Sequence, residues 1–183
     1  NEIDDDEDES FEDVPDYALT IFFTKAGYFK KITPQSLRMS GEQKLKEGDE
    51  LSQVIESSNA KELLFFTDKC QVYKARVSDF DDSKASVLGD YIPTALEFDD
   101  GEQPLYMAVT DDFKGYMLFF FENGKVAKVD MSAYETKTNR KKLIKAYGSK
   151  SPIVAAMYIR EDLELILTSS SGRMLLFNTA VIS

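Results

Sequence analysis

The side chains of this sequence that could do chemistry are lysines and arginines gathered in three clusters. The first cluster consists of Lys25, Lys30, Lys31, Arg38, Lys44 and Lys46. The second consists of Lys69, Lys74 and Arg76, and the third of Lys137, Arg140, Lys141, Lys142 and Lys145. Cations aimed at phosphates bind a nucleic acid without reading its sequence, because they release condensed counterions. The clusters therefore predict contacts with a phosphate backbone, and Lys125 and Lys128 are two weaker candidates. For any single lysine, the alternative is an ordinary solvated position.

Other kinds of chemistry find little support in the residue types. The sequence has no histidine, which is the commonest general base and metal ligand. Its single cysteine, Cys70, allows neither an internal disulfide nor a cysteine-built zinc site. We also find no glycine-rich phosphate loop and no paired-carboxylate motif. We therefore expect no catalytic residue, no metal site and no cofactor.

The net charge of −11 hides an uneven distribution of acidic residues. Ten of the 33 acidic residues lie in the first sixteen positions, and the remainder of the chain has 23 acidic against 22 basic residues. Residues 1–16 have few apolar side chains to offset the entropy of ordering, so we predict a disordered acidic linker there. Because the sequence begins at Asn1 rather than at a methionine, it looks like a piece of a longer chain.

Composition and hydropathy indicate a soluble protein. Hydrophobic residues make up 43% of the chain, enough for a packed core. The longest apolar run, Tyr116 to Phe121, is far shorter than the roughly 20 residues that a membrane-spanning helix needs. No signal peptide is evident. We therefore expect a cytoplasmic protein with no membrane partner.

Four segments of the chain share one pattern: a β-rich apolar run, a short polar turn, and a second run in which apolar and polar residues alternate. They lie near residues 20–37, 62–80, 116–134 and 163–182. This pattern is typical of β-hairpins. Gly27, Gly124 and Gly172 occupy the turns, with Cys70 at the equivalent place, and these positions are separated by 43, 54 and 48 residues. A period of about 50 residues is typical of propeller-like arrays.

The segments between the hairpins also resemble strands, so we predict an all-β array of three or four strands per repeat. A β-sandwich with coincidentally similar hairpins is the alternative. The stretch ETKTNRKKLIKAYG, residues 135–148, comes nearest to a helical pattern, and a helix there is the less favoured reading. At Cys70 we predict a strained backbone with positive φ, or alternatively a turn of another type.

The repeats resemble those in the C-terminal domain of the A subunit of bacterial type IIA topoisomerases, DNA gyrase and topoisomerase IV. The segments TKAGYFKKITPQSL, KLKEGDEL, LLFFTDKCQVYKARVSDF and SSSGRMLLFNTAVI carry this resemblance. The first is similar to the Thr/Ser-x-x-Gly-x-x-Lys pattern that opens a blade of the family. The resemblance covers nearly everything after about residue 17.

The resemblance implies a β-pinwheel of four-stranded blades over residues 17–183, of which this chain holds about three or four. It implies a non-catalytic domain that binds and bends duplex DNA on a basic outer rim. It further implies an ATP-dependent parent enzyme associated with the nucleoid, in which the partners of this domain are the cleavage domain of the same chain and an ATPase B subunit. The nucleophilic tyrosine of that enzyme would lie outside this sequence.

The sequence departs from the gyrase pattern in one place. Gyrase carries a box rich in glycine and arginine before KLKEGD, whereas residues 38–43 here read only RMSGEQ. This favours a topoisomerase IV protein, or a gyrase-like paralogue with weaker wrapping. The chain stops after the fourth hairpin, so the remaining blades are either missing from this piece or absent from the protein. The alternative function is a propeller-like module that binds protein partners.

Overall fold

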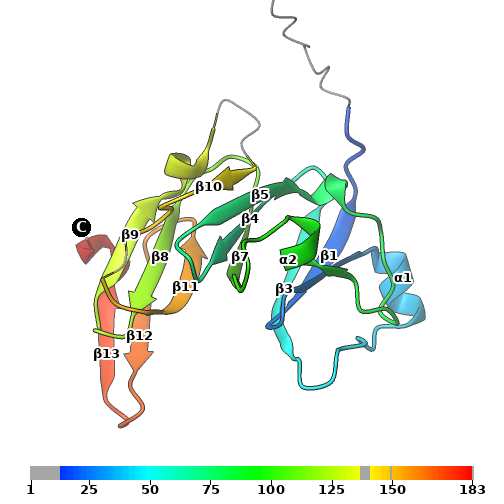
Figure 1. Cartoon of the computed structure of the whole chain (residues 1–183). Coiled ribbons are helices and arrows are strands. Elements are labelled where there is room, and N and C mark those ends of the chain that lie inside the picture. Colours follow the sequence, from blue (N-terminus) through cyan, green and yellow to red (C-terminus); the bar gives the residue numbers. More distant parts are fainter. Residues whose placement is uncertain (1–12, 137–140, 149, 183) are drawn as a thin grey trace, which may run out of the picture.

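The computed structural model describes residues 13–136, 141–148 and 150–182, and it shows a series of antiparallel sheets (Figure 1). In the first sheet, β1 (Ala18–Thr24) and β2 (Tyr28–Ile32) form the first predicted hairpin. Strand β3 (Leu51–Ser58) pairs with β1, and β6 (Asp90–Tyr91) pairs with the other side of β2. The strand order is therefore β3-β1-β2-β6.

The second sheet repeats this arrangement with the order β10-β5-β4-β7. Its hairpin consists of β4 (Glu62–Thr67) and β5 (Val72–Arg76), and β7 (Pro104–Thr110) pairs with β4. The edge strand β10 (Lys142–Leu143) pairs with β5 only after the chain has formed the next hairpin. Strand β6 reaches the first sheet in the same way, after the second hairpin. The first and second sheets therefore each receive a short strand from the repeat that follows.

The third sheet consists of β8 (Tyr116–Phe121), β9 (Val126–Asp130) and β11 (Ile153–Ile159), in the order β11-β8-β9. Strands β12 (Glu164–Thr168) and β13 (Met174–Asn178) form the fourth predicted hairpin. The described residues thus hold two sheets of four strands, one of three and one of two. The predictions of an all-β architecture and of a partial array of repeats are confirmed.

The helices are short and lie between strands. A short helix follows each hairpin: α1 (Pro34–Met39), η1 (Val77–Asp79), η2 (Met131–Tyr134) and η3 (Thr179–Val181). Helix α2 (Ile92–Ala95) directly follows β6. The described part of residues 135–148 contains strand β10 and no helix, which agrees with the favoured reading of that stretch.

The second sheet is buried on both of its faces, and this explains the continuous apolar run of β4. Leu63 and Phe65 join the core cluster shared with the first sheet. Leu64 and Phe66 point the other way and join the cluster shared with the third sheet. Successive side chains of a strand point to opposite faces. A strand placed between two sheets must therefore be apolar at every position rather than at alternate ones.

The hairpin turns confirm the predicted alignment of the repeats. Gly27, Gly124 and Gly172 have φ values of 106°, 79° and 81°. Cys70, at the equivalent place, has φ of 57°, so the prediction of a non-glycine residue in the left-handed region is confirmed.

Replacing Cys70 with glycine should therefore stabilise the fold. A residue with a Cβ loses roughly 1–2 kcal/mol in the left-handed region, and a protein of this size gains about 2–4 °C in melting temperature per kcal/mol. We expect Cys70→Gly to melt a few degrees above the parent protein in a thermal scan. Cys70→Ala is the control, because it removes the thiol without freeing the backbone. A Gly variant that melts no higher than the Ala variant would contradict the strain.

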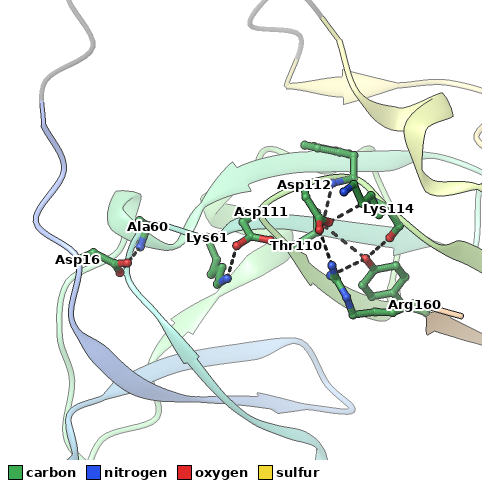
Figure 2. A network of polar contacts seen from close by, with 10 residues as sticks. Asp16, Ala60, Lys61, Thr110, Asp111, Asp112, Lys114 and Arg160 are labelled. Carbon is green, nitrogen blue, oxygen red and sulfur yellow. Dashed lines mark hydrogen bonds and ion pairs between the residues drawn. The ribbon is translucent and has the colours of Figure 1, made fainter.

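Polar links join the loops in which the chain crosses from one sheet to the next (Figure 2). In each link, a residue that precedes the first strand of a sheet in the chain (β1, β4 or β8) contacts a residue that follows the third strand of that sheet in the chain (β3, β7 or β11). The links join Asp16 to the amide of Ala60 at 3.0 Å, Lys61 to Asp111, and Asp112 to Arg160. Because the third strand of one sheet leads into the next sheet, the links follow one another across the repeats.

Candidate nucleic-acid interface

The fold brings the second basic cluster and the described members of the third, Lys141, Lys142 and Lys145, together along one edge of the second sheet. Strand β10 pairs antiparallel with β5, with Lys142 opposite Tyr73. The amide of Lys74 donates to the carbonyl oxygen of Lys141 at 2.7 Å, and the amide of Ala146 donates to that of Cys70 at 2.8 Å. Strands β5 and β10, which carry or adjoin the described members of two clusters more than sixty residues apart in the sequence, therefore lie side by side (Figure 1).

We call the cations that this pairing leaves at the surface the basic edge. Its members are Lys69, Arg76, Lys141, Lys142 and Lys145. All are exposed except Lys142, which is half-buried. They lie on or next to β5 and β10, which are held together by backbone hydrogen bonds. The basic edge is therefore a group of cations supported by two paired strands, with Lys142 on the face of Tyr73 and Arg76 on the opposite face.

Lys74 does not belong to the basic edge, although it alternates with apolar residues as predicted. Val72, Lys74 and Arg76 share one face of β5, but that face points toward the third sheet. The Lys74 ammonium donates to the Thr136 hydroxyl at 3.0 Å and lies 5.3 Å from the centre of the Phe113 ring. Burial lowers the pKa of Lys74. The side chain is thus engaged inside the protein, and we leave it out of the interface.

The Lys142 ammonium has a carboxylate partner. It lies 2.9 Å from an oxygen of Asp99 and 5.5 Å from the centre of the Tyr73 ring. The hydrogen bond with Asp99 raises the pKa of Lys142, and the same contact, together with one from Gln71, lowers the pKa of Asp99. Lys142 is therefore a charged but already paired member of the basic edge.

A buried glutamate fixes the turn that presents Asp99. Glu102 accepts hydrogen bonds from the hydroxyl of Thr67, the side-chain amide of Gln71 at 2.7 Å and the hydroxyl of Tyr73 at 2.5 Å. It also accepts from the backbone amide of Asp99 at 3.0 Å. Both carboxylate oxygens are thus satisfied by donors, as a buried charge requires. The result is a rigid turn beside β5.

Two residues of the first cluster are buried, which corrects the expectation that they reach a nucleic acid. Lys30 is 1% exposed, and its ammonium donates to the carbonyl oxygens of Lys44, Ala85 and Val87 at 2.9 to 3.3 Å. No carboxylate is among these partners, and burial lowers the pKa of Lys30. The side chain ties two loops to β2.

Lys31, the second of these residues, is 3% exposed and lies at the junction of the first two repeats. Its ammonium donates to the Asn59 side chain at 2.7 Å and to the Val77 carbonyl oxygen at 3.2 Å. Asp82 is 3.7 Å away. Tyr17 donates to Asp82 at 2.6 Å, which raises the pKa of Tyr17 to about 12. Lys31 therefore has a structural role.

The rest of the first cluster is on the surface of the first repeat. Arg38, Lys44 and Lys46 are exposed, whereas Lys25 forms an exposed ion pair with Glu50. Sequence reasoning missed Lys84, which is exposed. Its loop lies beside Lys44, because the Lys44 amide donates a hydrogen bond to the carbonyl oxygen of the next residue, Ala85. The acidic sequence neighbours of Lys84 concealed it, and only the crossing of the loop onto the first repeat brings it near the cluster.

The remaining candidates fall into two groups. Lys125 is exposed in the third hairpin turn, whereas Lys128 lies 2.8 Å from Asp162 and 4.2 Å from the centre of the Tyr116 ring. Lys128 therefore joins the third sheet to the fourth hairpin. Lys137 and Arg140 lie outside the described residues, as do residues 1–12 of the predicted linker.

The last residues of the predicted linker are described, and they contact the first repeat. The Pro15 carbonyl oxygen accepts from the Asn59 side chain at 2.9 Å, and Asp16 accepts from the Ala60 amide. The boundary between linker and repeat domain at residues 16 and 17 stays a prediction.

Among residues 13–136, 141–148 and 150–182, no three histidine, cysteine, aspartate or glutamate side chains are grouped so that they could hold a metal ion. The same residues include no helix of the length and hydropathy that crossing a membrane would need.

Repeated antiparallel sheets, two of which receive a short edge strand from the next repeat, define a β-pinwheel of the kind that the sequence predicts. Comparison with known proteins supports this class. The chain is 28% identical over 164 residues to the A subunit of DNA topoisomerase 4 from Streptococcus pneumoniae, and 23% identical over 175 residues to that of Staphylococcus aureus. These matches cover 85% and 93% of the chain but only 20% and 22% of the relatives.

A solved structure of the C-terminal domain of DNA topoisomerase IV is similar in fold, with a TM-score of 0.74 and 26% identity. The match covers 90% of this chain and 53% of that domain. No family model matches the chain. The resemblance to the C-terminal domains of type IIA topoisomerase A subunits is confirmed.

Proposed function

We propose that this chain is a non-catalytic domain that binds and bends duplex DNA within the A subunit of a type II topoisomerase. The observation that carries the proposal is the basic edge, where two clusters distant in the sequence meet on one rigid strand pair. Its cations suit contacts with phosphates, which position a duplex without regard to its sequence.

The arrangement of the sheets provides a physical reason for bending. The exposed cations Arg38, Lys44 and Lys46 lie on the first repeat, and the basic edge lies on the second. The core clusters fix the angle between neighbouring sheets. A duplex that contacts the cations of the first and the second repeat must therefore bend to match that angle. The cost of smoothly bending a short duplex by 40–90° is about 1–6 kcal/mol, which several phosphate contacts can offset.

The parent protein in this proposal is an ATP-dependent topoisomerase, since the chain spans about a fifth of the curated relatives it matches. Its partners would be double-stranded DNA, the cleavage domain of the same chain and an ATPase B subunit. The catalytic tyrosine would lie outside this chain. Such a protein would act in the cytoplasm at the nucleoid.

The test is the affinity of this chain for a duplex of about 40 base pairs, measured by fluorescence anisotropy over a series of salt concentrations. We expect binding that weakens steeply as salt rises and that does not depend on the base sequence. Absence of binding at low salt would contradict the proposal.

A second candidate, a module that binds a protein partner, is favoured by one specific observation. Apolar side chains are exposed on the fourth hairpin, including Ile166, Met174, Leu175 and Leu176. In the first three sheets, corresponding strands bury apolar side chains against a neighbouring repeat. Packing of a further repeat therefore explains this exposure as well as a partner protein does. DNA binding by the chain separates the two candidate functions.

A further inference from the structure

We infer that Asp99 occupies a phosphate-binding position on the basic edge and that the DNA backbone must displace its carboxylate. This inference rests on the proposed function, and it concerns how binding at that site is restrained. The position consists of the Lys142 ammonium and the Gln71 side-chain amide, each 2.9 Å from an oxygen of Asp99. Two donors therefore converge on one anionic group.

The Asp99 side chain lies between cations on the surface side and the buried Glu102 carboxylate, which shares the Gln71 amide donor with it. Lys69 adds its positive charge to that of Lys142 in lowering the pKa of Asp99, after the hydrogen bonds from Lys142 and Gln71. Lys141 and Lys145 flank Lys142 in the sequence and are exposed. A phosphate offers the same acceptor chemistry as a carboxylate and forms strong bonds with charged donors. The basic edge thus already holds one anion, supplied by the protein.

Release of Asp99 requires little rearrangement, because its backbone is fixed independently of its side chain. The Asp99 amide donates to Glu102, and Gln71 keeps a second hydrogen bond to Glu102 at 2.7 Å. The side chains of Lys142 and Asp99 are 35% and 47% exposed, respectively. An ion pair with this exposure contributes only about 0–1 kcal/mol. Rotation of the Asp99 side chain is therefore enough to free Lys142.

The consequence for binding is a difference of one ionic contact. With Asp99 in place, Lys142 must exchange a carboxylate for a phosphate, and the net gain in counterion release is small. Without the carboxylate, Lys142 contributes a full contact. One added phosphate contact steepens the slope of log affinity against log salt by up to about 0.9. The gain in affinity is at most about fivefold, because the exposed ion pair that DNA displaces is worth no more than about 1 kcal/mol.

The experiment compares two variants with the same change in net charge. Asp99→Asn removes the paired carboxylate, whereas Asp100→Asn removes the neighbouring one, which makes no side-chain hydrogen bond or ion pair with any described residue. For binding to a duplex of about 40 base pairs, we expect Asp99→Asn to bind roughly three- to fivefold more tightly with a steeper salt slope, and Asp100→Asn to change affinity less than about twofold.

A third variant shows whether the effect passes through Lys142. In a Lys142→Met background, Asp99→Asn should no longer tighten binding beyond the effect of Asp100→Asn. Equal effects of the two Asn variants, or a gain that survives Lys142→Met, would overturn the inference and leave only general electrostatics. If the parent protein and all variants fail to bind DNA at low salt, the proposed function fails. If the parent protein binds and Asp99→Asn has no effect, this inference alone fails.

Discussion

Reversing three charges of the basic edge should abolish most DNA binding. The variant combines Arg76→Glu, Lys141→Glu and Lys145→Glu, which are exposed positions on or beside β5 and β10. Each lost phosphate contact lowers affinity by close to tenfold at 0.1 M salt, so three should lower it by at least about a hundredfold. Anisotropy titration with a duplex measures the loss. A flatter salt slope should accompany it.

The matched control reverses three exposed cations elsewhere on the chain: Lys114, Lys150 and Arg173. It changes the net charge equally but leaves the basic edge intact. We expect it to lower affinity far less than the edge variant does. If both variants lose affinity to the same degree, the attraction comes from overall charge, and the basic edge is not the interface.

Truncating Phe65 should cause the largest loss of stability among single changes. Its ring lies 5.5 Å from the ring centre of Phe23 and 6.3 Å from that of Phe29, and the side chain is fully buried between the first two sheets. Phe→Ala substitutions in a core cost about 3–5 kcal/mol. We expect Phe65→Ala to lower the free energy of unfolding by this amount in guanidinium titrations monitored by circular dichroism.

The control for this prediction is Phe177→Ala in the fourth hairpin. Phe177 is half-buried, and its neighbours Leu175 and Leu176 on β13 are exposed. Removing its ring leaves a smaller cavity, so the loss should be well below that of Phe65→Ala. Similar losses for the two variants would mean that the second sheet is not the centre of the packing.

The hairpins could be predicted from the sequence because turn chemistry is local. A residue with positive φ lies at each of the four predicted turns, including Cys70. The apolar runs of β4 and β8 could also be recognised, since burial on both faces demands apolar residues at successive positions. These features need no knowledge of distant contacts.

The edge strands and the fate of individual lysines could not be predicted in this way. Strands β6 and β10 have two residues each, too few for any pattern. Lys30 and Lys31 look like surface residues, but carbonyl oxygens and Asn59 satisfy their ammonium groups inside the fold. Every residue has a backbone carbonyl oxygen, so the sequence does not show which of them accepts a hydrogen bond from a lysine. The sequence also did not predict the ion pair between Lys142 and Asp99, because that contact depends on the pairing of β10 with β5.

The measurement that tests the central claim most directly is the salt dependence of duplex binding by this chain. With four or more phosphates neutralised by the basic edge and the first repeat, log affinity should fall against log salt with a slope of about −3.6 or steeper. The slope should be the same for duplexes of unrelated sequence. A slope near zero, or no binding at low salt, would contradict the assignment of this surface to DNA.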